Sequence, residues 1–464
     1  MVNYRENYRD EASPFYLTEA TLSSERLPEG SSIDVSRVLT DLDIYEDITK
    51  PFLTGRCVIS DFNNIMSAIE LSGDETLKLT IQKPGNYPPV KKTFFIDSVI
   101  NSTKVNDSVE TYAVHLVEDV DYLANLENVN KSYQGKPSEI VKNIIAQYFP
   151  TKTFTPVIDT NLEKESNNPM KVIIPNLNPV EAITWVKKNS RTQEGMPYFL
   201  FTALAGGDKI YYADLGSLLS QLPINLSTPF RNWQAGTQYD YSSNEFQIVS
   251  YKNQNTDNLY KLIRNGNVGA THSFYDTING DGSKVDLDIE KIFEELDKNT
   301  VLSKAQKKWM YPEGSLIDKK RTSSYVSEKR FTYPVTKNYE DGFSSINGYN
   351  EEIDETAYRK KVIGSAISHF LEKNKMTVTV PGTIFLQNNE NNGNFTVGNV
   401  ASFYFMKNVE QTTETAGREI PIDKKRSGYY LITKTVHMFR AENYFINMDI
   451  CKLQNIITAE SDLA

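Results

Sequence analysis

The end of the chain carries two strand-like patterns of apolar residues. Residues 427–437 hold the apolar run 429–432 followed by Val436, and a short polar turn leads into 444–450, where Ile446, Met448 and Ile450 alternate with polar residues. A period of two is typical of β-strands that bury one face. These two segments predict an antiparallel β-hairpin.

A similar unit occurs far earlier, where residues 94–117 hold two alternating runs. Without gaps, segment 96–100 overlays segment 432–436, and a glycine-led strand pattern precedes each unit, from Gly73 and from Gly398. Recurrence of both pattern and order favours two related β modules. The identity is low, and alternating hairpins are common for structural reasons alone, so the residues by themselves leave duplication and two unrelated hairpins both open.

Further strand patterns surround the first unit, at Leu42 and Ile44, at residues 56–60, and at Leu77, Leu79 and Ile81. Residues 61–69 predict a short connector. We expect the polar stretch before Ile33 to be an arm that only a partner orders. Residues 1–125 therefore form a predicted first β module with an N-terminal arm.

The hydrophobic period changes between residues 126 and 228. After Pro137, apolar residues recur at helical spacing, and Asn178 followed by proline is the start signal of a second helix. Aromatic-rich strand patterns at 197–202 and 209–213 flank a glycine turn, and a leucine-rich helical turn follows. This region predicts an α+β domain.

The remaining residues predict a second β module that an insertion interrupts. Strand patterns at 246–251, 259–263 and 376–380 lead to the closing hairpin, and polar loops at 388–394 and 411–426 are expected to be exposed. The insertion has helical spacing at 289–296 and 358–370. The predicted domains are 1–125, the first β module; 126–228, the α+β domain; 229–275 with 376–456, the second β module; 276–375, an inserted mixed α/β domain; and 457–464, a C-terminal tail.

Composition and charge limit the functional classes. The 464 residues suit about three domains, and a formal charge of -10 argues against a dedicated nucleic-acid binder. The N-terminus lacks the apolar region of a signal peptide, and no apolar run is long enough to span a bilayer. Cys57 and Cys451 each lie in a strand pattern, which fits small core residues in a reducing compartment better than a disulfide or metal site.

Candidate chemistry is sparse. The four histidines are scattered without the spacing of a metal site, and no serine elbow or phosphate-binding glycine loop occurs. His115 and His437 lie in strand patterns, where we expect hydrogen-bonded structural histidines. Residues 279–288 are faintly similar to a calcium loop, but threonine precedes them where the first carboxylate should stand, so we interpret them as a turn. We predict no enzyme, no catalytic residue, no metal and no cofactor.

Three segments carry a resemblance to a known family: residues 45–116, residues 174–218, and residues 380–432 with the returning strand. Together they resemble the baseplate hub protein of contractile-tailed phages of the T-even type, which is similar to the hub part of type VI secretion spike proteins. Each segment is a loose hydrophobic pattern with a few fixed small residues. The resemblance spans much of the chain and favours duplication of the β module.

The resemblance implies a mostly β, α+β protein with two similar tube-forming antiparallel β-barrel-like modules per chain. It implies a homotrimer whose six modules form a pseudo-sixfold ring that joins the sixfold tail tube to the threefold central spike. The implied partners are further copies of the chain, the spike protein, the tail tube or tube-initiator protein, the baseplate wedge proteins and the tape measure protein. DNA would pass through without specific binding, and the implied location is the tail baseplate of the virion after assembly in the host cytoplasm.

Two departures and two alternatives accompany this interpretation. The insertion at 276–375 and the loop at 411–426 are long for the family, and the chain has no room after the second module for a spike, which we expect to be a separate protein. The acidic balance predicts a ring channel lined mostly by Asp and Glu. The alternatives are the equivalent hub of a bacterial contractile injection system or of a flexible phage tail and, in a different class, a tail-associated cell-wall hydrolase.

Overall fold

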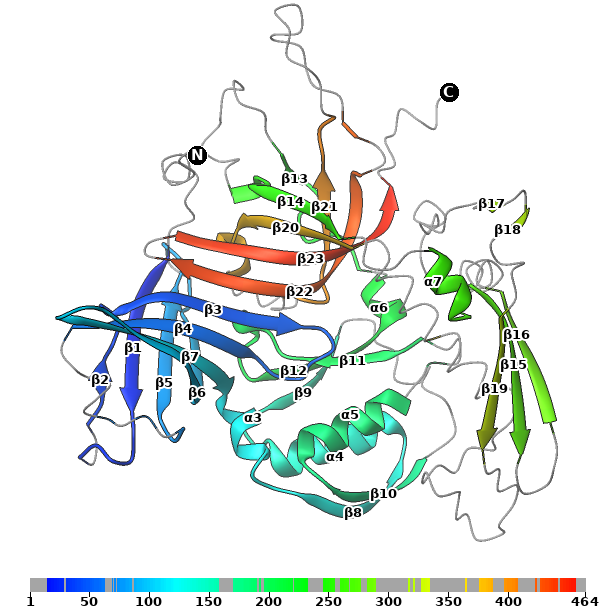
Figure 1. The fold of residues 1–464 in the computed structure, drawn as a ribbon, viewed down its shortest axis with the longest axis horizontal. Helices are drawn as coiled ribbons and strands as arrows, with labels where there is room; N and C mark the ends of the chain where they lie inside the picture. The colour runs from blue at the N-terminus through cyan, green and yellow to red at the C-terminus, as the bar shows by residue number, and fades with distance from the viewer. Residues whose placement is uncertain are drawn as a thin grey trace, which may run out of the picture.

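The computed structural model describes residues 15–28, 31–62, 69, 71, 73–85, 87–157, 170–189, 192, 196–219, 221–232, 245–254, 259–266, 268–276, 282–288, 316–317, 320–321, 327–333, 364, 375–386, 396–407, 422–423, 426–440 and 443–455. Within them the chain is mostly antiparallel β-sheet with few helices (Figure 1). The expectation of a mostly β, α+β fold is confirmed at this level.

A single sheet of 13 strands contains both the early and the late strand units. Its early strands are β1 (Tyr16–Ser23), β2 (Ile33–Asp34), β3 (Leu39–Asp47), β4 (Thr54–Asp61), β5 (Thr76–Gln82), β6 (Val90–Asn106) and β7 (Val109–Glu118). Its late strands are β13 (Phe230–Arg231), β14 (Ser250–Gln254), β20 (Lys375–Pro381), β21 (Val400–Tyr404), β22 (Gly428–Arg440) and β23 (Asn443–Asn455). The order is β14-β20-β23-β22-β3-β4-β7-β6-β5-β1-β2, with β21 beside β22 and β13 beside β21.

The two strand units have the same topology. In chain order the first unit is β3, β4, β5, β6, β7 and the second is β14, β20, β21, β22, β23. In each unit the first strand pairs with the second, the second with the fifth, the fifth with the fourth and the fourth with the third, always antiparallel. We call these five-strand units module 1 and module 2. The recurrence of pattern in the sequence therefore corresponds to a recurrence of strand order.

Local irregularities also recur between the modules. The β6–β7 pairing shifts register at Asp97, and the β22–β23 pairing shifts at Thr433, which are the residues that the gapless overlay places together. Gly73 and Gly398, just before the third strand of each module, both have positive φ, at 99° and 84°. Because glycine adopts this conformation without steric cost, the glycine-led start of each strand has a backbone reason.

The same backbone hydrogen bond closes both irregular regions. The N–H of Ile96 donates to the carbonyl of Glu75 at 2.9 Å, and the N–H of Ile432 donates to the carbonyl of Asn399 at 2.9 Å. Ile96 and Ile432 are the first residues of the overlaid segments. Equivalent residues therefore make equivalent hydrogen bonds next to equivalent bulges.

One hydrophobic core is shared by the two modules. Leu42, Ile44 and Cys57 of module 1 belong to the same buried cluster as Ile446 and Met448 of module 2. Burial of a large apolar side chain contributes about 1.5–3 kcal/mol, so a cluster continuous across the boundary stabilises the modules against separation. In Figure 1, β22 and β23 in orange-red lie beside β3 and β4 in blue.

The α+β domain follows β7 and packs its two main helices together. Its elements are α3 (Asp119–Ala124), β8 (Val129–Gly135), α4 (Pro137–Tyr148), β9 (Thr153–Pro156), β10 (Met170–Leu177), α5 (Pro179–Asn189), β11 (Tyr198–Phe201), η2 (Leu204–Gly206), β12 (Lys209–Asp214) and α6 (Leu215–Leu219). Strands β8 and β10 pair, and β11, β12 and β9 form a separate three-stranded sheet. The predicted helices and the β11–β12 hairpin are confirmed.

Local signals explain where these helices begin. Pro137 is the first residue of α4, where its missing N–H costs nothing. The Oδ1 of Asn178 accepts the N–H of Glu181 at 2.7 Å and so caps α5. Ile140 and Ile144, one turn apart on α4, are fully buried, so packing of this face holds the helix in place.

The remaining described elements include a second small sheet. They are α7 (Leu259–Arg264), β15 (Gly269–Asp276), β16 (Gly282–Asp288), β17 (Leu316–Ile317), β18 (Lys320–Arg321), β19 (Ser327–Tyr333) and η6 (Thr383–Leu386). Strands β16, β15 and β19 form a three-stranded sheet in which β15 and β19 are parallel. Within the described ranges, no helix is long and apolar enough to span a membrane.

The expectation of an unpaired N-terminal arm is wrong from Tyr16 onward. Strand β1 pairs with β5 over its whole length, and Ala20 and Leu22 are fully buried. A register shift between Leu17 and Glu19 breaks the alternation, and alanine is a weak apolar signal, so the pattern is hidden in the sequence. The arm before Phe15 lies outside the described residues.

The expected strand at 259–263 is also wrong, because residues 259–264 form helix α7. A short apolar run suits either element, and leucine and isoleucine at 259, 262 and 263 have the i, i+3, i+4 spacing of a helix. The strand expected at 246–251 is displaced, since β14 begins at Ser250.

Several expectations fall outside the described residues. These are the helices at 289–296 and 358–370 apart from residue 364, the loop at 388–394, most of the loop at 411–426 and the tail at 457–464. Of the calcium-like segment, residues 282–288 are described and form strand β16. The domain boundaries therefore remain predictions.

Candidate functional site

The boundary between the modules is a continuous strand pairing. Seven residue pairs of β22 and β3, from Lys434 opposite Asp47 to Arg440 opposite Asp41, join module 2 to module 1. We call this pairing the seam, residues 41–47 with 434–440. Only the second half of β22 takes part, because its first half pairs with β21. The bulge at Thr433 separates the two halves.

Ion pairs cross the seam on the sheet face that points away from the core. Lys434 Nζ lies 2.9 Å from Asp47 Oδ2, and Arg440 Nε lies 3.0 Å from Asp41 Oδ1. Arg440 also bonds Asp43. Opposite charges in directly opposed positions favour this register over its alternatives. Partly exposed ion pairs contribute little free energy, so they act mainly on alignment.

A buried carboxylate crosses the seam on the core face. Glu46 of β3 has no exposed side-chain surface and lies 2.9 Å from His437 Nε2 of β22. Its oxygens also accept the N–H of Leu204 at 2.6 Å and the N–H of Val397 at 3.3 Å. Thr435 donates its hydroxyl at 3.1 Å. One side chain thus connects module 1, module 2 and the α+β domain.

The electrostatics of this buried group favour its charged form. Burial by itself would raise the pKa of Glu46, but the His437 ring and the hydrogen bonds from Leu204 and Val397 outweigh it and lower the pKa. The second ring nitrogen of His437 lies 2.7 Å from the hydroxyl of Tyr444. Burial and the nearby Glu46 carboxylate raise the pKa of that tyrosine. The network is a chain of fully hydrogen-bonded polar groups.

A second buried network joins module 1 to the α+β domain. Glu118, at the end of β7, bonds Lys152 and lies 3.6 Å from Lys92. It also accepts the N–H of Leu53 at 3.0 Å and the hydroxyl of Thr202 at 3.4 Å. Burial opposes ionisation of Glu118, but the two lysines more than offset it and lower the pKa of this carboxyl group.

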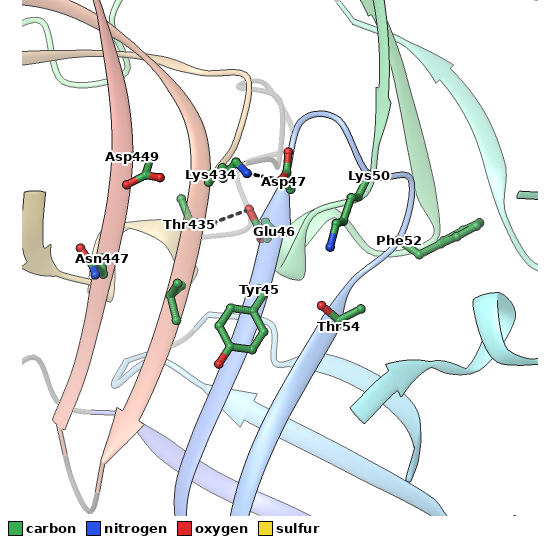
Figure 2. Close-up of a pocket in the computed structure, with 11 residues that line it drawn as sticks. Tyr45, Glu46, Asp47, Lys50, Phe52, Thr54, Lys434, Thr435, Asn447 and Asp449 are labelled. Atoms are coloured by element: carbon green, nitrogen blue, oxygen red, sulfur yellow. Dashed lines mark hydrogen bonds and ion pairs between the residues drawn. The ribbon is translucent and has the colours of Figure 1, made fainter. Parts of the chain in front are cut away.

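A cavity of about 330 Å³ lies over the seam (Figure 2). Its lining comes from β3, β4, β22, β23 and the turn after β3, and consists of Tyr45, Glu46, Asp47, Lys50, Phe52, Thr54, Lys434, Thr435, Val436, Asn447 and Asp449. Figure 2 shows the Lys434–Asp47 ion pair at its edge. The lining holds no histidine, cysteine or serine, and two of its carboxylates are already bonded, Glu46 to Thr435 and Asp47 to Lys434.

The histidines and cysteines singled out in the sequence are hydrogen-bonded or buried within strands. His437 is bonded to Glu46 and Tyr444, and His115 lies 3.3 Å from Asp97, so both histidines are hydrogen-bonded in strands as predicted. Cys57 and Cys451 are buried free thiols. In the part of the chain that the structure describes, no cluster of three or more His, Cys, Asp or Glu could hold a metal ion. The absence of enzymatic activity remains a prediction.

Sequence reasoning missed Glu46 and the seam. A signal for the carboxylate is present, because Glu46 is in phase with the buried Leu42 and Ile44 on β3. His437 is likewise in phase with the buried Phe439 on β22. A charged group in phase with apolar positions indicates a buried, paired polar group. The sequence holds no comparable signal for which strands meet.

Comparison with known proteins gives a result at the level of structure alone. No protein-family model matches the sequence, and no curated protein sequence matches it. Among solved structures, a 43 kDa tail protein of prophage MuSo2 from Shewanella oneidensis matches with a TM-score of 0.51 at 10% identity, covering 94% of this chain and 98% of its own. A tail protein from Neisseria meningitidis MC58 matches with a TM-score of 0.50 at 13% identity, covering 95% and 97%.

The chain has the fold of these tail proteins. The expected resemblance to phage tail proteins is thereby confirmed for the fold, and nearly the whole length of both chains takes part. A chain of the Francisella PdpA–VgrG complex matches at a lower TM-score of 0.45 with 11% identity, covering 98% of this chain and 62% of that one. In this tail-protein fold, the seam is the structural feature that makes two modules into one sheet.

Proposed function

We propose that this protein is a structural baseplate hub of a phage tail. Three copies form a ring that adapts the sixfold tail tube to the threefold central spike and contributes to the DNA channel. The tail-protein fold supports a structural role in a tail. The observation that carries the finer proposal is the presence of two modules of identical strand order, joined edge to edge in one sheet.

Two similar modules per chain would let one ring match partners of two different symmetries. A hexameric tube end presents six equivalent surfaces, and a closed ring of three chains with two similar modules each presents six similar surfaces in return. The threefold symmetry of the same ring suits a trimeric spike. A single-module protein would need six copies, and its six identical surfaces would exceed the three that a threefold partner offers.

The proposed channel wall is the sheet face opposite the core. At the seam this face carries Asp41, Asp43 and Asp47, and each of these carboxylates is paired with Arg440 or Lys434. The expectation of a wall lined mostly by Asp and Glu stays a prediction, and at the seam three carboxylates face two cations. Both of these cations are paired, which fits passage of DNA without specific binding.

The proposed surroundings follow from this role. The partners are two further copies of the chain, the central spike protein, the tail tube or tube-initiator protein, the wedge proteins and the tape measure protein. The location is the tail baseplate of the virion, after assembly in the host cytoplasm. Neither a cofactor nor a chemical reaction forms part of the proposal.

Native mass spectrometry of the purified full chain tests the ring. The expected mass is three times the 52.8 kDa of one chain, in a single stable species. A stable monomer or dimer across micromolar concentrations contradicts the proposal. Zymography on peptidoglycan tests the alternative class, because a hub leaves the gel unchanged whereas a cell-wall hydrolase produces clearing.

A further inference from the structure

The long hairpin of module 1 has an open edge. Strand β6 pairs with β5 through residues 90–95, and beyond Ile96 the described strands pair with it only through β7. Every residue from 97 to 106 is exposed, and Val99, Ile100 and Val105 are 42%, 54% and 63% exposed. An open strand edge with apolar side chains is a template for another strand.

The opposite end of the same sheet has a second open edge. Strand β14 pairs on one side with β20, and within the described residues no strand covers its other side. The outer half of β6 and the free side of β14 are thus two unpaired edges on the module strands of the sheet. Strand β6 belongs to module 1 and β14 to module 2, and each is antiparallel to the strands with which it pairs.

The seam shows what covers such edges inside the chain. By the shared strand order, β22 of module 2 corresponds to β6 of module 1, and β3 of module 1 corresponds to β14 of module 2. In the seam the outer half of β22 pairs antiparallel with β3. The two open edges are therefore the counterparts of the two strands that already pair with each other within one chain.

We infer that the outer half of β6 pairs antiparallel with β14 of a neighbouring copy, which repeats the seam between chains. This inference rests on the proposed ring and specifies its contact. If the same strand pairing joins modules within a chain and between chains, all module boundaries are alike. Three chains then close into a ring of six modules, provided that each pairing rotates one module relative to the next by the same angle. The occupant of both edges is a second copy of this chain.

The seam also fixes the register of the pairing on the β6 side. In the seam Met438 lies opposite Asp43. Met438 pairs with Phe445 in β23, and the counterpart of that pair in module 1 is Thr103 with Thr111, counted along the fifth strand from the equivalent pairs Ile432–Ile450 and Ile96–Leu116. The count follows the fifth strand because β6 has an extra residue between Val99 and Asn101 that β22 lacks. Thr103 is therefore the counterpart of Met438.

The same counting applies to the other strand. Asp43 pairs with Arg56 of β4, and Lys252 of β14 pairs with Thr377 of β20. Arg56 and Thr377 are counterparts on the second strands of the two modules. Arg56 pairs with His115 of β7 and Thr377 pairs with Asp449 of β23, and each of these partners lies next to the bulge of its hairpin. Lys252 is thus the counterpart of Asp43. The inferred contact places Thr103 directly opposite Lys252 of the neighbouring copy.

Cysteine cross-linking tests this register. Opposed residues of antiparallel strands have Cα atoms about 4.5–5.5 Å apart, within the range of a disulfide. We expect the double variant Thr103→Cys/Lys252→Cys of the full chain, oxidised with copper phenanthroline, to give a covalent closed trimer on a non-reducing gel. The native thiols, Cys57 and Cys451, are buried and do not compete.

The matched control is the double variant Lys104→Cys/Lys252→Cys. A slip of one residue turns the side chain to the other face of the sheet, so we expect no covalent trimer from it. Both changes on β6 concern exposed positions, and circular dichroism tests that the variants fold as the parent does.

The outcomes separate the contact from the ring. Cross-linked trimers from the Thr103 variant alone support both. Trimers by native mass without cross-linking overturn the β6–β14 contact and leave the ring standing. A covalent ladder beyond three chains supports the contact and contradicts the closed ring. Monomers without cross-links, or equal cross-linking in both variants, overturn the contact.

Discussion

Replacing Glu46 with alanine removes the charged group that links three parts of the molecule. The variant loses the bond to His437 and leaves the N–H groups of Leu204 and Val397 without their acceptor. All of these groups are buried, so water cannot replace the carboxylate without opening the seam. We expect Glu46→Ala to be among the most destabilising single changes at the seam.

The magnitude follows from the type of contact. Removing one partner of a buried charge pair costs about 3–5 kcal/mol. Scaled to the 464 residues of the full chain, 1 kcal/mol shifts the unfolding midpoint by about 1 °C, so the midpoint falls by on the order of 3–5 °C. Glu46→Gln keeps one oxygen but turns an amide NH₂ toward one of the donors, so its effect is intermediate.

Differential scanning calorimetry of the full chain at pH 7.5 measures this effect. The matched control is Asp47→Asn, because Asp47 is the next residue on the same strand and pairs with Lys434; their side chains are 11% and 47% exposed. Asparagine keeps an oxygen for the N–H of Thr49, so the change removes mainly a partly exposed ion pair, which contributes about 1 kcal/mol or less. Hydrogen exchange provides a second readout, since the amides of β3 and β22 lose protection only if the seam itself opens.

One result refutes the reasoning directly. If the free energies of unfolding of Glu46→Ala and Asp47→Asn differ by less than about 1 kcal/mol, the buried network stabilises the fold no more than a surface ion pair does. A large loss of stability in Glu46→Ala with unchanged hydrogen exchange of the β3 and β22 amides also contradicts the prediction, because the destabilised region would then lie away from the seam.

Three further predictions concern other buried groups. Burial lowers the pKa of Lys187 from 10.5 to about 8, which disfavours folding below pH 8, so the wild type gains stability relative to Lys187→Met as the pH rises from 8 to 10.5 in thermal scans. The pKa of Glu118 is lowered from its ordinary value of 4.5, so the ionised carboxylate stabilises the fold above pH 4.5, and this stability is lost as the pH falls through the lowered pKa. In an acid titration followed by circular dichroism, Glu118→Gln should therefore lose less stability between neutral and acidic pH than the wild type does. Gly398→Ala should lower the unfolding midpoint more than Gly207→Ala, because both have positive φ but only the added Cβ at Gly398 meets the Phe201 ring, at 2.7 Å; equal effects contradict that packing argument.

Elements with strong local signals could be predicted from the sequence. The closing hairpin has two long apolar strand patterns joined by a short polar turn, and α4 and α5 each have proline at the first helical position. Strand β1 and helix α7 were mispredicted because a bulge and a short apolar run remove the local signal. Both errors lie where tertiary packing, and not periodicity, decides the element.

The pairing across the seam could not be predicted in this way. Glu46 and His437 are far apart in the chain, and only the fold brings β3 beside β22. The recurring pattern at 96–100 and 432–436 did indicate two similar hairpins. It carried no information on how the two modules join, because edge pairing depends on backbone hydrogen bonds that any sequence can make.

Cryo-electron microscopy of the purified full chain tests the central claim most directly. We predict a closed ring with threefold symmetry in which six similar β modules follow one another, with β6 of each chain beside β14 of the next. A ring with another number of modules, or a threefold particle whose chains meet through surfaces other than these strand edges, would contradict it.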